Sequence, residues 1–347
     1  MPAESGRASD PERSGASAPP VHSLLDRRLV IVTGKGGTGK TSVCAALALA
    51  AASRGRQVLV AEVGLGEHLP RLFQPGASPV GYAGRELRRG LNAMHVDPFA
   101  ALGEYLGLQL GARRVVDLAL RNHAFRQLME ASPGWRELIT LGKVWHLSQA
   151  RSESGRPRYD MIIVDAPATG HGMTFLDVPR VVISAVRAGP LRRHAGLVES
   201  MICDQHDTLL LPVTLAEELP ARETYQLVER AREEIGIALD RVVVNAVAEP
   251  PFPAGLDDLD RRLAALPADL PLRSLPSPRV LAACASFLAA RHELNQSYLG
   301  QIEQRTALPV VALPYLAQGL RGAADIEVLA GALLGGDPRD EAERDAP

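Results

Sequence analysis

The sequence has few cysteines, few lysines, few aromatic side chains and almost no net charge. Its three cysteines, Cys44, Cys203 and Cys284, are far apart and form no C-x-x-C pair. That argues against a zinc site, an iron–sulfur cluster and a secreted disulfide framework.

A formal charge of −2 gives no basic footprint for nucleic acid or an anionic membrane surface. The longest apolar run, 43–52, is about half a transmembrane helix, and the N-terminus lacks the apolar core of a signal peptide. We therefore expect a reduced, cytoplasmic protein with no integral membrane segment and no nucleic-acid partner.

Lysine is the most informative scarcity. Among 38 Lys plus Arg residues, only Lys35, Lys40 and Lys143 are lysines. Two of the three lie in one eight-residue stretch, where a compact ammonium differs physically from a guanidinium fork. The sequence uses arginine for ordinary positive charge, so this stretch requires lysine specifically.

That stretch fits the phosphate-binding pattern G-x-x-x-x-G-K-[ST], between an apolar strand candidate and an Ala/Leu-rich helix candidate from 41 to about 54. Glycines let backbone N–H groups point at phosphate oxygens, and the helix N-terminus adds partial positive charge. Lys40 would contact the β- and γ-phosphates, and the Thr41 hydroxyl would ligate Mg²⁺. The residues expected to bind ATP here are Gly34, Lys35, Gly36, Gly37, Thr38, Gly39, Lys40, Thr41 and Ser42.

Lys35 follows the first glycine, which marks the deviant form of this loop. In proteins with that form, the extra lysine reaches across a dimer interface to the partner's nucleotide, and it would act there with Lys40 in catalysis. The alternative is a solvated loop lysine.

Short apolar runs recur at 29–32, 58–61, 161–164, 208–213, 241–245 and 309–313, alternating with helical stretches. This alternation predicts an α/β fold, a mostly parallel sheet with helices on both faces. From 97 to about 157 nothing resembles a strand, while Leu138, Leu141 and Trp145 recur at helical spacing. We expect a helical insertion there.

Composition also predicts the limits of the domain. Residues 1–26 and the acidic tail 335–347 have the composition of disordered segments. Between them, 27–334 would form one P-loop NTPase domain. Its helical subdomain would cover about 97–157, joined by a helical pair within about 175–203 that Gly189 and Pro190 divide.

A second motif follows the run at 161–164, which ends in Asp165 and continues Ala166-Pro167-Ala168-Thr169-Gly170-His171. A carboxylate at the carboxyl end of such a strand is suited to hold the Mg²⁺ water shell. We expect Thr41 and Asp165 to serve the metal, with Asp165 contributing to catalysis. His171 could belong to a switch at 165–171 that senses the γ-phosphate, and a packing or helix-capping function is an equal alternative.

The loop at 34–41 and the motif at 165–171 together resemble the arsenite-efflux (ArsA-type) ATPase family, which includes the ATPase that targets tail-anchored membrane proteins. The resemblance covers most of 28–334, and the stretches 133–138, 141–145, 217–220 and 313–315 resemble a bacterial branch of unassigned role. It implies a Mg²⁺-ATPase working as a nucleotide-sandwich dimer, either a homodimer or a heterodimer with a paralogue. It further implies that Asn245 reads adenine, that Pro314 flanks the base, and that the insertion contacts an apolar client protein.

The sequence departs from that family in three respects. Gly64 falls where the family's first switch presents an Asp that orients the attacking water, so either Glu62 or Glu67 substitutes or hydrolysis is slow or absent. The arsenite-binding cysteines are missing, which makes arsenite an improbable substrate, and Cys44 has the position of a packing residue. The zinc-binding C-x-x-C of the targeting ATPase is also absent. The client groove of that ATPase is rich in methionine, whereas Met129 is the one methionine in the insertion of this sequence.

Three functions remain open from the residues. The first is an ATPase that couples nucleotide state to a partner or apolar client, and the second is a hydrolysis-deficient nucleotide-binding scaffold paired with an active paralogue. The third is a Min- or Par-type partition ATPase, which the net acidic C-terminus disfavours. Lys143 could anchor an acidic partner, reach the nucleotide or lie solvated on a helix surface.

Overall fold

The computed structural model describes residues 24–64, 66–110, 121–131, 134–250, 261–262, 265 and 278–335. The two expected tails lie almost wholly outside these residues. The N-terminal tail was expected to run to residue 26, and this boundary is wrong. Leu24–Asp26 form a short 3-10 helix whose two leucines are buried, because they join the apolar layer beneath the sheet.

The described part of the chain forms an eight-stranded sheet with the order β3-β4-β2-β5-β1-β6-β7-β8. Every neighbouring pair is parallel except β3 and β4. The strands are β1 (Leu29–Gly34), β2 (Val58–Glu62), β3 (Arg85–Arg88), β4 (Leu91–His95), β5 (Met161–Ala168), β6 (Thr208–Leu215), β7 (Val242–Val247) and β8 (Val310–Pro314). All six predicted strands occur, and the predicted α/β fold is confirmed.

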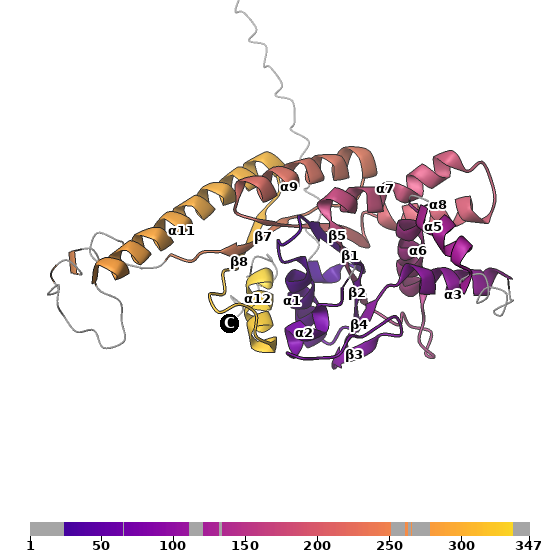
Figure 1. The fold of residues 1–347 in the computed structure, drawn as a ribbon, viewed down its shortest axis with the longest axis horizontal. Helices are drawn as coiled ribbons and strands as arrows, with labels where there is room; N and C mark the ends of the chain where they lie inside the picture. The colour runs from indigo at the N-terminus through magenta and orange to yellow at the C-terminus, as the bar shows by residue number, and fades with distance from the viewer. Residues whose placement is uncertain are drawn as a thin grey trace, which may run out of the picture.

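Helices cover both faces of this sheet (Figure 1). One face carries α1 (Lys40–Ser53), α2 (Leu69–Phe73) and α12 (Ala323–Leu334). The other carries α6 (Trp135–Gln149), α7 (Thr169–Ala185), α8 (Pro190–Ile202), α9 (Glu218–Arg230), a π-helical turn (Ala231–Ile235) and α11 (Pro278–Thr306). Between β4 and β5 the chain also forms α3 (Pro98–Leu110) and α5 (His123–Ala131), which with α6 occupy the stretch predicted as a helical insertion.

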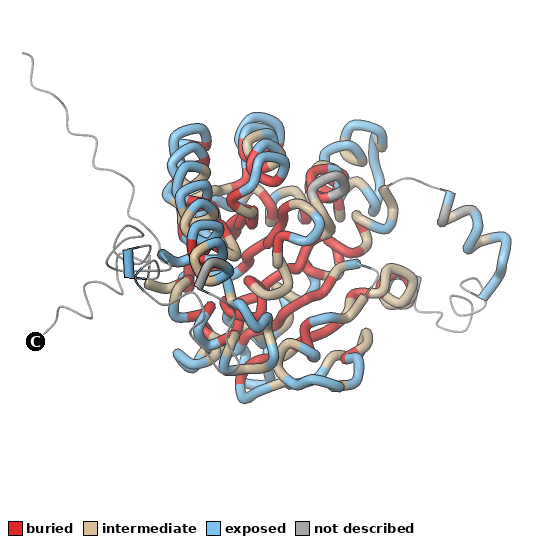
Figure 2. The backbone as a smooth tube through the Cα atoms, turned by 60° about the vertical axis from the view of Figure 1, so that its left-hand side comes forward, coloured by how far each residue is buried: buried red, intermediate tan, exposed pale blue. Residues whose placement is uncertain are grey.

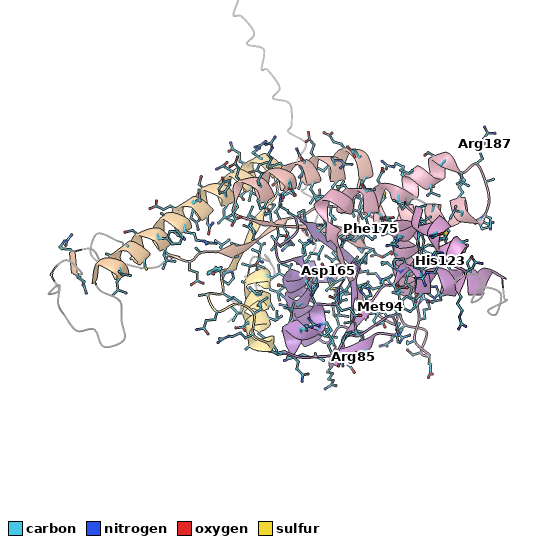
Figure 3. All side chains as sticks on the ribbon, in the orientation of Figure 1. Arg85, Met94, His123, Asp165, Phe175 and Arg187 are labelled. Carbon is cyan, nitrogen blue, oxygen red and sulfur yellow. The ribbon has the colours of Figure 1, made fainter. Side chains whose placement is uncertain are left out.

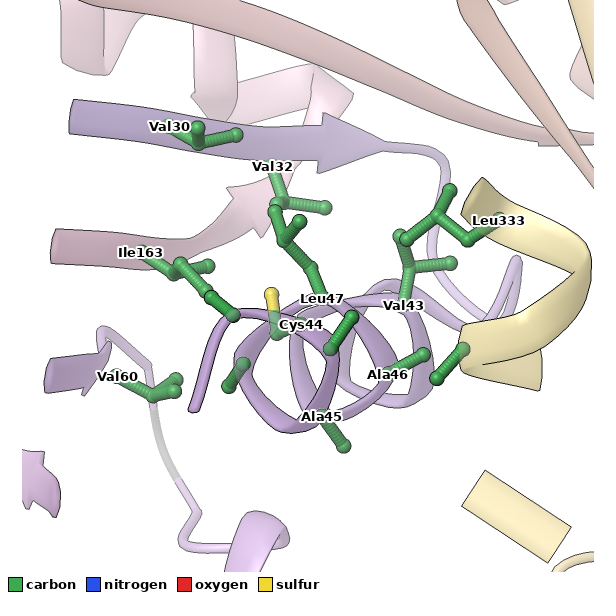
Figure 4. Close-up of a cluster of buried hydrophobic side chains, with 14 of the residues drawn as sticks. Val30, Val32, Val43, Cys44, Ala45, Ala46, Leu47, Val60, Ile163 and Leu333 are labelled. Atoms are coloured by element: carbon green, nitrogen blue, oxygen red, sulfur yellow. The ribbon is translucent and has the colours of Figure 1, made fainter. Parts of the chain in front are cut away.

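The central helix α1 is buried on nearly all sides because it lies between the sheet and α12. Cys44 and Leu47 face Val32 of β1 and Ile163 of β5, and Val43 lies beside Leu333 of α12 (Figure 4). Cys44 is fully buried in this layer, which confirms its expected packing function. In Figure 2 the buried backbone follows the strands, and the exposed faces belong to the outer helices.

Two strands were not predicted. The segments β3 and β4 lack a continuous apolar run, since β3 reads Arg-Glu-Leu-Arg and β4 reads Leu-Asn-Ala-Met-His. β3 is the edge strand, and charged side chains on an edge strand hinder its pairing with other chains, so its sequence does not resemble that of a buried strand. No helix in the described residues is both long enough and apolar enough to cross a membrane.

Candidate functional site

The candidate nucleotide loop joins β1 to α1 at the carboxyl edge of the sheet, where ligands of open parallel sheets bind. β1 is the central strand, paired with β5 on one side and β6 on the other. A Cβ on Gly34 would lie 2.0 Å from the carbonyl oxygen of Val213 in β6. Only glycine therefore fits where the loop leaves the sheet. Gly36 and Gly37 are exposed, so the loop backbone is open to a ligand.

The Lys40 side chain folds back over this loop. Its Nζ donates to the carbonyl oxygens of Gly34 and Lys35, both at 3.1 Å. Burial lowers the pKa of the Lys40 ammonium, and the carboxylate of Asp165 opposes that shift. An ammonium satisfied by two neutral carbonyls can exchange them for charged phosphate oxygens, which are stronger acceptors.

Thr41 and Asp165 meet at the first turn of α1. The Thr41 hydroxyl donates to Oδ2 of Asp165 at 2.6 Å, although the residues are 124 positions apart. Asp165 is 8% exposed and lies near the middle of the molecule (Figure 3). Burial raises its pKa, while the Thr41 hydrogen bond and the Lys40 charge lower it. A buried carboxylate beside a hydroxyl is a donor set that suits Mg²⁺, whose preferred ligands are oxygen atoms.

A second buried carboxylate, Glu62, lies beside Asp165, since β2 pairs with β5 so that these two residues are opposite each other. Its Oε1 accepts the backbone N–H groups of His68 at 2.7 Å and Leu69 at 2.9 Å. Its Oε2 is buried without a hydrogen-bond partner in the described residues. Burial raises the pKa of Glu62 to about 7, although the two amides oppose the shift.

Glu67 faces away from this cluster. Its Oε2 accepts the backbone N–H groups of Val80 and Gly81 and so holds the chain that precedes β3. Gly64 leaves open space where a side chain would project, with no heavy atom within 4 Å. Of the two carboxylates that could replace the missing Asp, only Glu62 lies beside Asp165.

Lys35 has an intrachain partner that was not predicted. Its Nζ forms a short ion pair with Oε1 of Glu223 on α9, and about one third of each side chain is exposed. A solvated loop lysine without a partner does not describe this structure. The sequence held one signal, because Glu223 lies on the helix after the family-like stretch 217–220, but nothing in it marked which acid would pair.

Asn245 contacts the loop from β7. Its Nδ2 donates to the carbonyl oxygen of Thr38 at 3.0 Å, and a Cβ on Gly39 would lie 2.1 Å from the same nitrogen. Gly39 also has a φ of 89°, which favours glycine. Ser42 lies half-buried in the first turn of α1, and Pro314 ends β8 opposite Val247. The structure thus brings the loop, Asp165 and Asn245 together, while Pro314 ends β8, which β6 and β7 separate from β1.

The side chains of Thr169 and His171 lie outside the described residues, although the backbone of 169–171 forms the start of α7 directly after β5. Within the described parts of the chain, no group of three or more His, Cys, Asp or Glu residues is arranged to hold a metal ion.

A parallel sheet covered on both faces, with a glycine-rich loop between its central strand and a buried helix, defines a P-loop NTPase. A family model described as anion-transporting ATPase (ArsA) matches residues 27–198. ATPase BagA of Mycobacterium tuberculosis is 34% identical over 248 residues, 69% of this chain and 69% of that protein. ATPase GET3 of Chaetomium globosum is 26% identical over 330 residues, 90% of this chain and 92% of that protein. The chain belongs to the ArsA-type ATPase family and is a nucleotide-binding ATPase.

Proposed function

We propose that this protein binds and hydrolyses Mg²⁺-ATP and that ATP closes two subunits into a dimer. The observation that carries the proposal is the convergence of Lys40, Thr41 and Asp165 at one end of the central strands. These are an ammonium, a hydroxyl and a buried carboxylate around a loop with exposed backbone N–H groups. Phosphoryl transfer depends mostly on positioning and on stabilising charge, and these groups supply both.

Each residue has a defined task in this proposal. The backbone of 34–39 and Lys40 bind the phosphates, and Asn245 and Pro314 lie toward the base. Thr41 and Asp165 would hold Mg²⁺, which would neutralise charge on the β- and γ-phosphate oxygens. Lys35 of one subunit would reach the nucleotide of its partner, and a partner or apolar client protein would respond to the change between open and closed dimers. Exposed Leu191 of α8 is a candidate client contact.

The test is the mass in solution with and without Mg²⁺-ATP, with phosphate release followed on the same sample. We expect ATP to double the mass of the wild-type protein. Lys35→Ala should remain a monomer with ATP while binding nucleotide within roughly threefold of wild type, because its own loop stays intact. A wild-type protein that binds ATP and stays a monomer would contradict the dimer and leave the binding site standing.

Glu223→Gln tests the same dimer in the opposite direction. Lys35 can cross to a partner only after leaving Glu223, and a neutral amide holds the ammonium less firmly. A partly exposed ion pair contributes little free energy, so the effect should be small. We expect the protein concentration at which half of the chains are dimeric with ATP to be about two- to fivefold lower than for the wild type. If Glu223→Gln instead raises that concentration, Glu223 supports the closed dimer and the pair does not compete with it.

We further propose that Glu62 replaces the missing switch Asp, with its unpartnered Oε2 accepting a proton from the attacking water. Glu62→Gln should lower ATP turnover by about 10- to 100-fold. The amide oxygen can still accept the two N–H groups at the start of α2, so the fold should hold. Glu67→Gln is the matched control and should keep turnover, since Glu67 is bonded to 80–81.

A second readout separates chemistry from binding in these variants. The Mg²⁺ concentration that half-saturates ATP binding should rise in Glu62→Gln only if Glu62 also acts on the metal's water shell. Wild-type turnover as low as that of Glu62→Gln would instead favour the second candidate function, a hydrolysis-deficient scaffold. The open space at Gly64 is the observation that supports that alternative.

A further inference from the structure

A hollow of about 340 Å³ lies between α3, α6 and α8. None of the residues that line it belongs to the candidate nucleotide site. Figure 1 shows these three helices gathered at one end of the molecule, beyond β2 and β4. The volume falls within the range of sites that bind small organic molecules. We refer to this hollow as the α3–α6–α8 pocket.

The floor of the pocket is an ion pair. Lys143, the third lysine of the chain, donates to Oε2 of Glu104 at 2.6 Å, and only 11% of its side chain is exposed. The Tyr82 hydroxyl donates to the same oxygen at 2.5 Å, and the Lys143 ammonium lies 4.9 Å from the centre of the Tyr82 ring. Burial alone would raise the pKa of Glu104, but the hydrogen bonds from Lys143 and Tyr82 outweigh it and lower that pKa. The lysine is therefore largely buried and paired within the chain, and it is not a solvated helix-surface lysine.

One wall of the pocket is aromatic. The His194 ring lies between Tyr105, at 5.0 Å, and Trp145, at 5.3 Å between ring centres. Burial lowers the pKa of His194, which favours the neutral form of the ring. Gly142 makes room for it, because a Cβ there would lie 3.0 Å from Nε2 of His194. Flat rings held edge to face provide a surface on which a flat apolar ligand can pack.

The rim carries a second positive charge. Arg193, in the first turn of α8, is exposed and has no side-chain hydrogen bond or ion pair among the described residues. The lining also holds Lys143 and the carboxylate of Glu104, whose Oε1 lies 3.7 Å from Nε2 of His146. A guanidinium fork matches the geometry of a carboxylate. Arg193 is therefore the group on the rim that can pair with one negative charge of a ligand.

We propose that the α3–α6–α8 pocket binds a small organic acid, with one carboxylate at Arg193 and a flat apolar body against Tyr105, Trp145 and His194. A wholly apolar occupant, such as a hydrophobic peptide helix, fits poorly because it would cover the charged Lys143–Glu104 pair and leave Arg193 without a partner. The inference is independent of the proposed ATPase cycle, since it uses none of that site's residues.

The probe is 1-anilinonaphthalene-8-sulfonate, an aromatic monoanion excited by energy transfer from tryptophan. Trp135 and Trp145 are the two tryptophans of the chain, and Trp145 lines the pocket. We expect saturable energy transfer that 2-naphthoate reverses. Neutral 2-naphthamide has the same shape and should need about a tenfold higher concentration, the effect of one charge-assisted contact.

Two variants locate the site. Arg193→Gln, an exposed change that leaves packing intact, should weaken 2-naphthoate about three- to tenfold and leave 2-naphthamide unchanged. Gly142→Val should abolish displaceable transfer by pushing His194 into the hollow, provided its unfolding midpoint stays near wild type. Arg232→Gln, on the exposed π-helical turn, is the matched control and should change neither ligand. Transfer that both Arg193→Gln and Gly142→Val leave unchanged would place the probe elsewhere, for example on exposed Phe287 of α11, and would overturn the proposal.

Discussion

Replacing Lys40 with alanine is expected to reduce ATP turnover at least about a hundredfold, the effect of removing one preorganised charge from the transition state. The Lys40 ammonium is confined by the loop, where it bonds the carbonyl oxygens of residues 34 and 35. No neighbouring cation can take its place, because the Lys35 ammonium of the same chain points to Glu223. Phosphate release under saturating Mg²⁺-ATP is the measurement.

Two controls give this result its meaning. Lys40→Arg keeps the charge but adds a planar fork too large for the loop, so it should also lose most turnover. Arg232→Gln, on the exposed π-helical turn, should retain it. The unfolding midpoint of Lys40→Ala should stay close to that of the wild type. The two carbonyl oxygens that lose the Lys40 hydrogen bonds are only partly buried, so water can donate to them instead. Turnover in Lys40→Ala equal to wild type would mean that the measured phosphate release comes from another protein or another site.

The sequence was informative where one stretch carries both the structure and the chemistry. The loop at 34–41 forces its own conformation through glycine, and the runs that became β1, β2, β5, β6 and β7 are apolar because these strands are buried for most of their length. The sequence could not reveal β3, whose charged side chains face solvent at the edge of the sheet. It also misplaced the start of α7, because Gly170 and Gly172 resemble a loop and the helix begins at Thr169.

Pairings between distant charges were the other limit. The ion pair between Lys35 and Glu223 joins residues 188 positions apart, and Lys143 pairs with Glu104 39 positions away. Each depends on how helices pack against the sheet, which no local pattern encodes. The choice between Glu62 and Glu67 has the same origin. Glu62 is the last residue of β2 and Glu67 follows the strand, and only the register between β2 and β5 places Glu62 beside Asp165.

Gly34→Ala is expected to destabilise the protein by more than about 3 kcal/mol or to prevent its accumulation in soluble form. The added methyl group would meet the backbone carbonyl of Val213 at 2.0 Å. A flexible side chain could move aside, but this oxygen belongs to β6, which pairs with β1 at the centre of the sheet. Relief requires separating two central strands. The measurement is the free energy of unfolding from urea titration.

Gly36→Ala is the matched control in the same loop, because its Cβ would lie 3.9 Å from that of Ala168, an ordinary contact. We expect its stability to stay within about 0.5 kcal/mol of wild type. Its ATP affinity should nevertheless fall, since the methyl group would stand on the exposed face of the loop where phosphate must approach the backbone. The two substitutions thus separate the structural demand for glycine at residue 34 from the ligand's demand at residue 36. Equal stability of both variants would show that β6 does not restrict the loop.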